Sequence, residues 1–291
     1  MAAIQLPAEN ALVRNTVRLL AGPTPDLMTS TGTGFFYQVI HPVTNAAKVL
    51  MITNKHVVRG AEFVRFVLSS APALSDLDAE HQPKSRSDDE FAVSLAGNLI
   101  LHPEVDTDLC AIDVTMQYGL LLNSGRQIRA MNLDWSWVIE DTDRIALRDI
   151  EQVLVIGYPS GLWDSHNNMP IARRGITATH ALARYQGKTN FLVDVAAFQG
   201  SSGSPVFLYE SPWFRQPDGS CSPGTKVAFI GVVWGVVERT VTGELQAVEM
   251  PSAVTQVPVM QSPMNLAIAL HADAVRDFDE IVFPGIRALQ K

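Results

Sequence analysis

The chain has 291 residues, 47% of them hydrophobic and 18% charged, and a formal net charge of −8 at pH 7. A chain of this length and composition forms a globular protein, as one large domain or two lobes, and not a disordered one. The acidic balance argues against nucleic acid as the main partner, because phosphate binding requires clustered cations. The densest basic stretch holds only Arg173, Arg174, Arg184 and Lys188, which indicates a solvated strand and loop.

The sequence shows no sign of export or membrane insertion. It begins MAAIQLP without an early Lys or Arg, and Glu9 and Arg14 interrupt any signal-like apolar run. The longest apolar run, residues 227–237, is too short to span a bilayer. Cys110 and Cys221 cannot form a disulfide framework. We therefore expect a cytoplasmic protein with no membrane partner; a processed precursor is the alternative.

Short β-branched or aromatic runs, separated by turn residues, recur along most of the chain. Such runs at close spacing predict an all-β protein built from antiparallel sandwiches or barrels. Strands are expected within residues 15–22, 32–40, 48–53, 62–70, 98–103, 108–114, 150–159, 175–185, 190–198, 204–210, 226–237 and 244–250. These runs form two groups, so we expect a first β-lobe over residues 1–115, a connector over 116–149 and a second β-lobe over 150–260.

The last segment, residues 261–291, has a different period. Apolar residues recur there at spacings of three and four, as on one face of a helix. They are Leu266, Leu270, Ala274, Phe278 and Ile281. Ser262 could cap such a helix and Pro263 suits its first turn, so we expect a C-terminal amphipathic helix followed by a tail.

The stretch GSSGSP, residues 200–205, joins two runs that look buried. Taken alone, it is more often a plain Gly/Ser turn. A sharp turn between two strands can, however, raise the Ser202 hydroxyl off the sheet and point successive N–H groups into one space. Gly200 allows backbone angles that other residues avoid, and Gly203 leaves room for an approaching carbonyl. The N–H groups of Gly200 and Ser202 would then form an oxyanion hole.

A serine hydroxyl becomes a good nucleophile only when a base takes its proton. Of the seven histidines, His56 has the best context, because an apolar strand runs into a polar corner there. A histidine satisfied by backbone at a strand end is the commoner role for any one histidine. His102 is the second choice, although the proline and acidic residues after it indicate a surface loop.

The base in turn needs a carboxylate to fix its tautomer and stabilise its imidazolium. The stretch VDTDLCAIDV offers Asp106, Asp108 and Asp113. Asp108 directly precedes the apolar run 109–112 and can be held at the edge of the core. Asp106 is expected in a loop, and Asp113 at a strand end that faces water.

The order His56, Asp108, Ser202, in the contexts TNKHVV, DTDLCAIDV and GSSGSP, resembles the trypsin-like (chymotrypsin-fold) serine peptidases. STGTGFF, VIGYPSGL with RRGITA, and DVAAFQGSSGSP further resemble their bacterial HtrA-like branch. The resemblance covers about residues 15–250 and implies two antiparallel β-barrels with the site between them. His56 and Asp108 would come from the first barrel and Ser202 from the second.

Two departures from the family pattern carry predictions. Ser201 stands where digestive trypsin-like enzymes have an aspartate that pairs with a freed N-terminus, so we expect no activation by N-terminal insertion. Ser204 replaces a second glycine, which is a small change. The sequence ends soon after the expected helix, so we expect no PDZ module of the HtrA type.

The resemblance also assigns substrate-binding residues. Ala196, six residues before Ser202, would form the floor of the specificity pocket, and its small uncharged side chain predicts small or medium apolar P1 residues, unless Glu244 or Glu249 intrudes. Val233, Trp234 and Gly235 resemble the strand that pairs with substrate backbone. Trp234 on its own is read equally well as a core aromatic residue.

The leading hypothesis is a serine endopeptidase that acts on protein or peptide substrates through an acyl-enzyme; an activating partner protein is left open. A catalytically weak peptide-binding or scaffold module on the same fold, or an esterase, are the alternatives. GTGFF lacks the third glycine of a dinucleotide motif, so no cofactor is expected. Without an HExxH motif or a cysteine pair, no metal is expected either.

Overall fold

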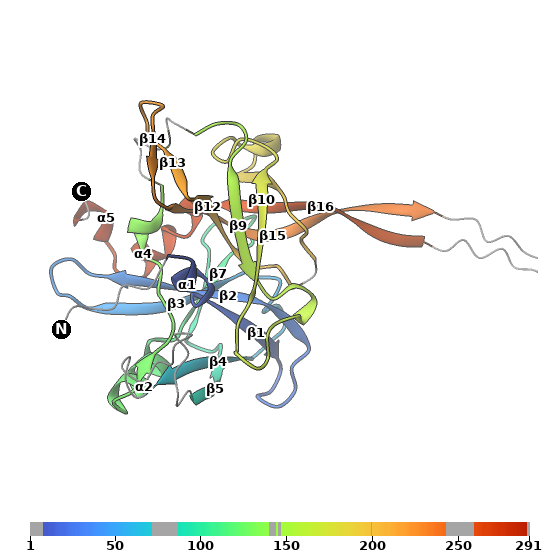
Figure 1. Ribbon diagram of the computed structural model, residues 1–291. Helices are drawn as coiled ribbons and strands as arrows, with labels where there is room; N and C mark the ends of the chain where they lie inside the picture. Colours follow the sequence, from blue (N-terminus) through green and yellow to red (C-terminus); the bar gives the residue numbers. More distant parts are fainter. Residues whose placement is uncertain are drawn as a thin grey trace, which may run out of the picture.

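A computed structural model describes residues 8–71, 87–139, 144, 147–198, 200–242 and 259–289. The chain folds into two antiparallel β-structures that pack against each other (Figure 1). The first is an eight-stranded sheet in the order β5-β4-β1-β2-β3-β7-β6, with β8 paired to β4. Its strands are β1 Thr16–Gly22, β2 Ser30–Ile40, β3 Ala47–Thr53, β4 Phe63–Ala71, β5 Ser87–Ser94, β6 Leu99–Leu101, β7 Cys110–Asp113 and β8 Gln127–Ile128.

The second β-structure is a closed six-stranded barrel in the order β10-β11-β16-β15-β12-β9. Its strands are β9 Gln152–Gly157, β10 Ile171–Thr177, β11 Asn190–Asp194, β12 Pro205–Glu210, β15 Lys226–Thr242 and β16 Val259–His271. The outer parts of β15 and β16 project from the barrel as a long two-stranded arm (Figure 1). A separate pair, β13 Trp213–Arg215 and β14 Cys221–Pro223, lies between β12 and β15 in the chain. The all-β, double-barrel prediction is confirmed, with the first half a curled sheet whose described strands do not form a closed path.

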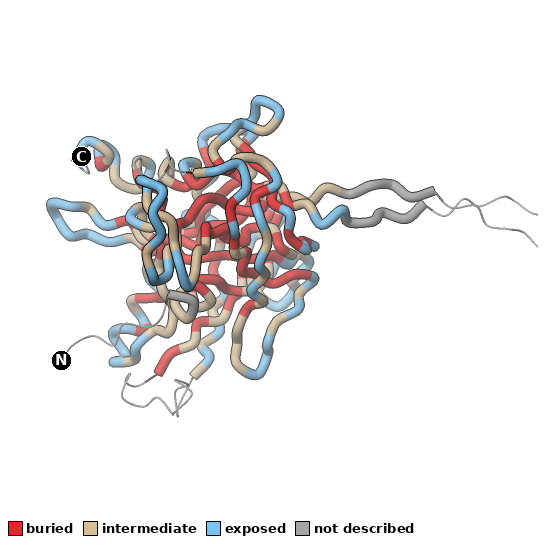
Figure 2. The backbone as a smooth tube through the Cα atoms, turned by 45° about the horizontal axis from the view of Figure 1, so that its top comes forward, coloured by how far each residue is buried: buried red, intermediate tan, exposed pale blue. Residues whose placement is uncertain are grey.

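Strand β2 supplies side chains to two hydrophobic cores. Because side chains alternate between the faces of a strand, Phe35 and Tyr37 enter a large core shared with the second barrel, whereas Phe36 enters the core of the first half. Phe35 packs on Phe229 of β15, with ring centroids 5.4 Å apart. In Figure 2 the buried residues accordingly gather where the two halves meet. One face of β2 therefore belongs to the core shared with the second barrel, and its other face belongs to a separate core of the first half.

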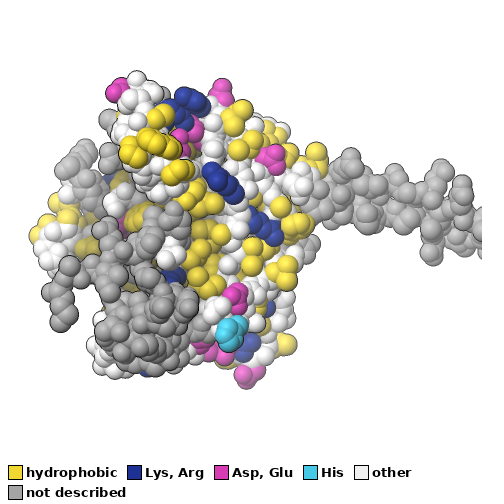
Figure 3. Space-filling model, viewed as in Figure 1, with side chains coloured by type: hydrophobic (Ala, Val, Ile, Leu, Met, Phe, Trp, Pro, Cys, Tyr) yellow, Lys and Arg dark blue, Asp and Glu magenta, His cyan; other side chains and the backbone are white. Residues whose placement is uncertain are grey.

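Helical segments are short. The α-helices are α1 Ala8–Val13, α2 Thr115–Asn123, α4 Asp277–Val282 and α5 Ile286–Leu289, and the 3-10 turns include η3 Pro159–Gly161 and η5 Ala272–Ala274. Among the described residues, no helix is both long and apolar enough to cross a membrane. On the face shown in Figure 3, the described charged side chains are scattered among hydrophobic and uncharged ones.

The prediction of a helix beginning at Ser262 was wrong. Residues 259–271 form strand β16, which pairs with β11 on one side and β15 on the other, so the barrel extends past the boundary predicted at residue 260. Ala267 and Ala269 of β16 are fully buried, which is the period of a strand. Strand pairing on both edges stabilises the extended conformation more than the helical spacing of apolar residues favours a helix. The first α-helix after the strand, α4, begins at Asp277. The strand predicted within residues 244–250 lies outside the described residues.

Candidate active site

The register of two neighbouring strands brings His56 and Asp108 together. Strand β3 ends at Thr53, which pairs with Cys110 at the start of β7. His56 lies in the turn after β3, and Asp108 lies just before β7. Since the strands are antiparallel, the end of one adjoins the start of the other, and the two side chains meet there.

His56 lies between a carboxylate and a hydroxyl. Its Nδ1 is 2.5 Å from Oδ2 of Asp108, and its Nε2 is 2.9 Å from Oγ of Ser202. The other carboxylate oxygen, Oδ1, accepts the backbone N–H of His56 at 3.0 Å. With Nδ1–H donated to Asp108, a neutral imidazole has its free lone pair on Nε2, facing the serine hydroxyl. The arrangement is therefore competent for proton transfer from Ser202.

Asp108 is suited to stay ionised. Burial raises the pKa of its carboxyl, but the hydrogen bonds from His56, the electrostatic interaction with His56 and the charge of Arg59 together bring the pKa below its usual value. The backbone of Asp108 is also fixed, because the Asn54 side-chain amide donates to its carbonyl oxygen at 2.6 Å. A charged, immobile carboxylate can hold one imidazole tautomer.

The turn that carries Ser202 requires two glycines. Gly200 and Gly203 have φ values of +85° and +86°, in the left-handed region. A Cβ at Gly200 would lie 2.6 Å from the Tyr158 carbonyl oxygen, and one at Gly203 would lie 1.9 Å from the Thr33 carbonyl oxygen. The space at Gly203 is thus filled by a carbonyl of the first half.

Hydrogen bonds hold the rest of this turn. The N–H of Ser201 donates to the Phe198 carbonyl at 3.0 Å, and the N–H of Gly203 donates to the Val233 carbonyl at 2.8 Å. No acceptor within the described part of the chain bonds the N–H groups of Gly200 or Ser202. These two donors are available to a ligand atom.

The residues predicted to bind substrate lie in three environments. Ala196 is exposed on the segment between β11 and the turn. Val233 is fully buried, and its N–H donates to the Ser204 carbonyl at 2.9 Å. Trp234 and Gly235 are partly exposed at an irregularity in the pairing of β15 with β16. Glu244 and Glu249 lie outside the described residues.

The other candidate residues from the sequence lie outside the group formed by His56, Asp108 and Ser202. His102 is buried instead of lying on a surface loop; its Nε2 is 3.1 Å from Asp277 of α4. Asp113 pairs with Lys48 at 2.7 Å, and Asp106 is exposed. Cys110 is fully buried, as a core residue.

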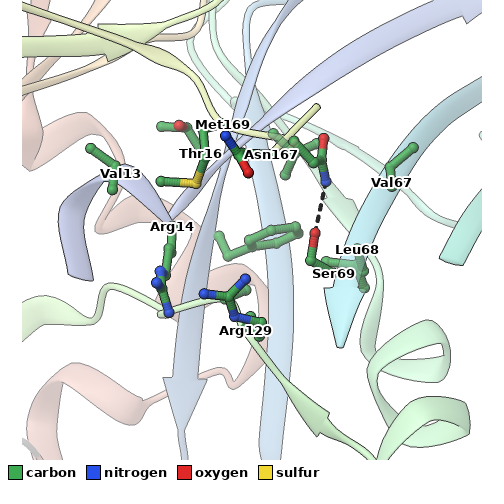
Figure 4. A pocket seen from close by; sticks show the side chains of 13 residues that line it. Val13, Arg14, Thr16, Val67, Leu68, Ser69, Arg129, Asn167 and Met169 are labelled. Atoms are coloured by element: carbon green, nitrogen blue, oxygen red, sulfur yellow. Dashed lines mark hydrogen bonds between the residues drawn. The ribbon is translucent and has the colours of Figure 1, made fainter. Parts of the chain in front are cut away.

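A cavity of about 30 Å³ is lined by residues of the first half and of the segment between β9 and β10 (Figure 4). Arg14, Thr16 and Arg129 line it, and the Asn168 amide donates across it to the Ser69 hydroxyl at 2.9 Å. Its volume suits one or two water molecules. It does not involve the three residues of the candidate active site.

Comparison with known proteins identifies the family of the chain. Residues 32–211, more than half of the chain, match the trypsin-like peptidase domain. The chain belongs to this family and is a trypsin-like serine endopeptidase, whose substrates are proteins or peptides.

The solved structures that resemble the chain are only distantly similar to it. The serine endoprotease from Yersinia pestis is 13% identical, with a TM-score of 0.45 over 97% of this chain and 69% of that one. Rv3671c from M. tuberculosis in an inactive form is 14% identical, with a TM-score of 0.44 over 96% and 92%. Its active form is 15% identical, with a TM-score of 0.42 over 92% and 81%. No curated protein matches the chain.

Proposed function

We propose that the chain cleaves peptide bonds with Ser202 as nucleophile, His56 as general base and acid, and Asp108 as the carboxylate that orients His56. The observation that carries this proposal is the position of one imidazole between two partners, 2.5 Å from Asp108 and 2.9 Å from Ser202. Each distance is within hydrogen-bond range.

The reaction proceeds in two halves. Ser202 Oγ attacks the carbonyl carbon while its proton passes to Nε2 of His56, and the imidazolium is stabilised by Asp108. The oxyanion accepts hydrogen bonds from the N–H groups of Gly200 and Ser202. His56 then gives its proton to the leaving amine, which leaves an acyl-enzyme on Ser202. Water, deprotonated by His56, attacks the acyl carbon; the ester bond to Ser202 then breaks, His56 returns the proton to Ser202 Oγ, and the acid is released.

Substrate recognition falls to two segments. Ala196 offers a small uncharged floor, so we expect cleavage after small or medium apolar residues. Trp234 and Gly235 are partly exposed and would pair with substrate backbone as an added strand, whereas the buried Val233 supports the nucleophile turn. The cytoplasmic location and the absence of an activating N-terminal insertion stay predictions.

Labelling by a fluorophosphonate probe tests the catalytic assignment. Wild-type protein should be labelled on Ser202, and Ser202→Ala should not; Ser220→Ala, on the exposed turn before β14, should label like wild type. A wild-type protein that stays unlabelled favours the scaffold alternative. Profiling with a peptide library then distinguishes a peptidase from an esterase and reads the P1 preference.

A further inference from the structure

Thr33 lies at the contact between the two halves, on strand β2, with a fully buried side chain. Its hydroxyl donates to the Gly200 carbonyl at 3.0 Å. The same oxygen accepts the Tyr158 N–H at 3.0 Å and the Ser204 hydroxyl at 3.3 Å. A threonine hydroxyl has one donor and two acceptor sites, so its capacity is fully used. All three partners belong to the second half of the protein.

The backbone of Thr33 adds two further links. Its N–H donates to the Ser202 carbonyl at 2.9 Å. Its carbonyl accepts the Thr53 hydroxyl at 2.8 Å, and Thr53 ends the strand that leads to His56. One residue therefore connects the segment of the general base with the turn of the nucleophile.

The bond to Gly200 has a specific geometric effect. The peptide unit between Gly200 and Ser201 lies between the two N–H groups proposed as oxyanion donors, and it is planar. Fixing its carbonyl fixes the plane of the whole unit. Gly200 is a glycine and lacks the steric restriction that would hold this plane by itself. An external hydrogen bond can supply that restriction.

We propose that the Thr33 hydroxyl is a positioning residue for the peptidase reaction: it holds the Gly200 carbonyl so that the N–H groups of Gly200 and Ser202 converge on the oxyanion. This inference rests on the proposed function of Ser202. Thr33 does not touch substrate and acts through the nucleophile turn alone.

Two substitutions at Thr33 isolate the hydroxyl. Thr33→Val keeps the shape and removes the hydrogen bonds, whereas Thr33→Ser keeps the hydroxyl. The matched control is Thr177→Val in β10: Thr177 is also buried, and its hydroxyl accepts the Glu151 N–H at 2.9 Å and donates to the Asp149 carbonyl at 3.0 Å. Its loss removes similar bonds without touching the nucleophile turn.

The test measures kcat and KM on a peptide substrate, the rate of fluorophosphonate labelling, and the melting temperature of each variant. Assays run well below the lowest melting temperature. Thr33→Val should lower kcat and the labelling rate about 10- to 100-fold with KM within about threefold, because transition-state stabilisation is lost and not ground-state binding. Thr33→Ser should stay within about threefold of wild type. Thr177→Val should melt at a lower temperature and keep its kcat.

Equal kcat in Thr33→Val and Thr177→Val, with active wild type, overturns the role of Thr33 and leaves the proposed function intact. A wild type that neither turns over nor labels overturns the proposed function itself. If Thr33→Val does not fold, Thr33→Ala replaces it, since the smaller side chain leaves space for a water at the Tyr158 N–H. Wild-type kcat in a folded Thr33→Ala likewise overturns the proposal.

Discussion

Thr53 and Cys110 are paired across β3 and β7, and this single register brings Asp108 to Nδ1 of His56. The position of the carboxylate is therefore set by the pairing of strands in the sheet. Asp108→Asn preserves the shape but removes the charge and can select the wrong imidazole tautomer. We expect kcat to fall about 10³- to 10⁴-fold with little change in KM.

Steady-state kinetics on a peptide substrate check this expectation. Asp106→Asn is the matched control, because Asp106 is two residues away and exposed. Similar kcat values for the two variants would show that Asp108 does not take part in catalysis.

Gly203→Ala should abolish activity and destabilise the fold. Its φ of +86° disfavours a side chain, and the added Cβ would lie 1.9 Å from the Thr33 carbonyl oxygen, so backbone must move. Gly187→Ala is the matched control, since its φ is +77° and no atom lies within 4 Å of the added Cβ. We expect about 1 kcal/mol of destabilisation at Gly187 and clearly more at Gly203, measured by urea unfolding. Equal losses would contradict the close packing at Gly203.

Asp279 should make stability depend on pH. Burial raises the pKa of its carboxyl to about 6, although Tyr37, Arg276 and Arg287 act in the opposite direction. The folded protein therefore holds this proton more tightly than the unfolded chain, and stability is lost as pH rises from about 4 to about 6.

Asp279→Asn should remove this penalty. Relative to wild type, it should gain on the order of 1–3 kcal/mol at pH 7 and little at pH 4. Urea midpoints at the two pH values measure the difference. A gain of the same size at both pH values would show that the titration of Asp279 is not its source.

Ala196→Asp should shift the P1 preference toward Arg and Lys. A carboxylate at the pocket floor would attract a basic side chain, and we expect the ratio of kcat/KM for Arg over Val at P1 to rise at least about tenfold. Ala172→Asp on β10 is the control, because Ala172 is also exposed but lies outside the segment between β11 and the nucleophile turn. An unchanged ratio in Ala196→Asp places the pocket floor elsewhere.

The three residues that meet at the candidate site could be predicted from the sequence because each lies in a short segment with its own signal: a glycine-rich turn for Ser202, a strand end for His56, and an acidic residue before an apolar run for Asp108. Thr33 could not be predicted in this way. The partners of its hydroxyl are 125, 167 and 171 residues away, so no local pattern reports them.

The C-terminal strand was missed for a different reason. Apolar residues at spacings of three and four fit a helix, but the same segment also places Ala267 and Ala269 on one face at a spacing of two. The choice between helix and strand depends on the free edges of β11 and β15, with which this segment pairs. These edges are a product of the tertiary fold, so no local sequence pattern indicates them.

Phe35 and Tyr37 pack on one face of strand β2 and Phe36 packs on the other, so β2 contributes to both hydrophobic cores. Unfolding of either half would therefore expose one face of a strand that the other half needs. We consequently expect heat or denaturant to unfold the protein in one cooperative transition, with peptidase activity and tertiary structure lost together.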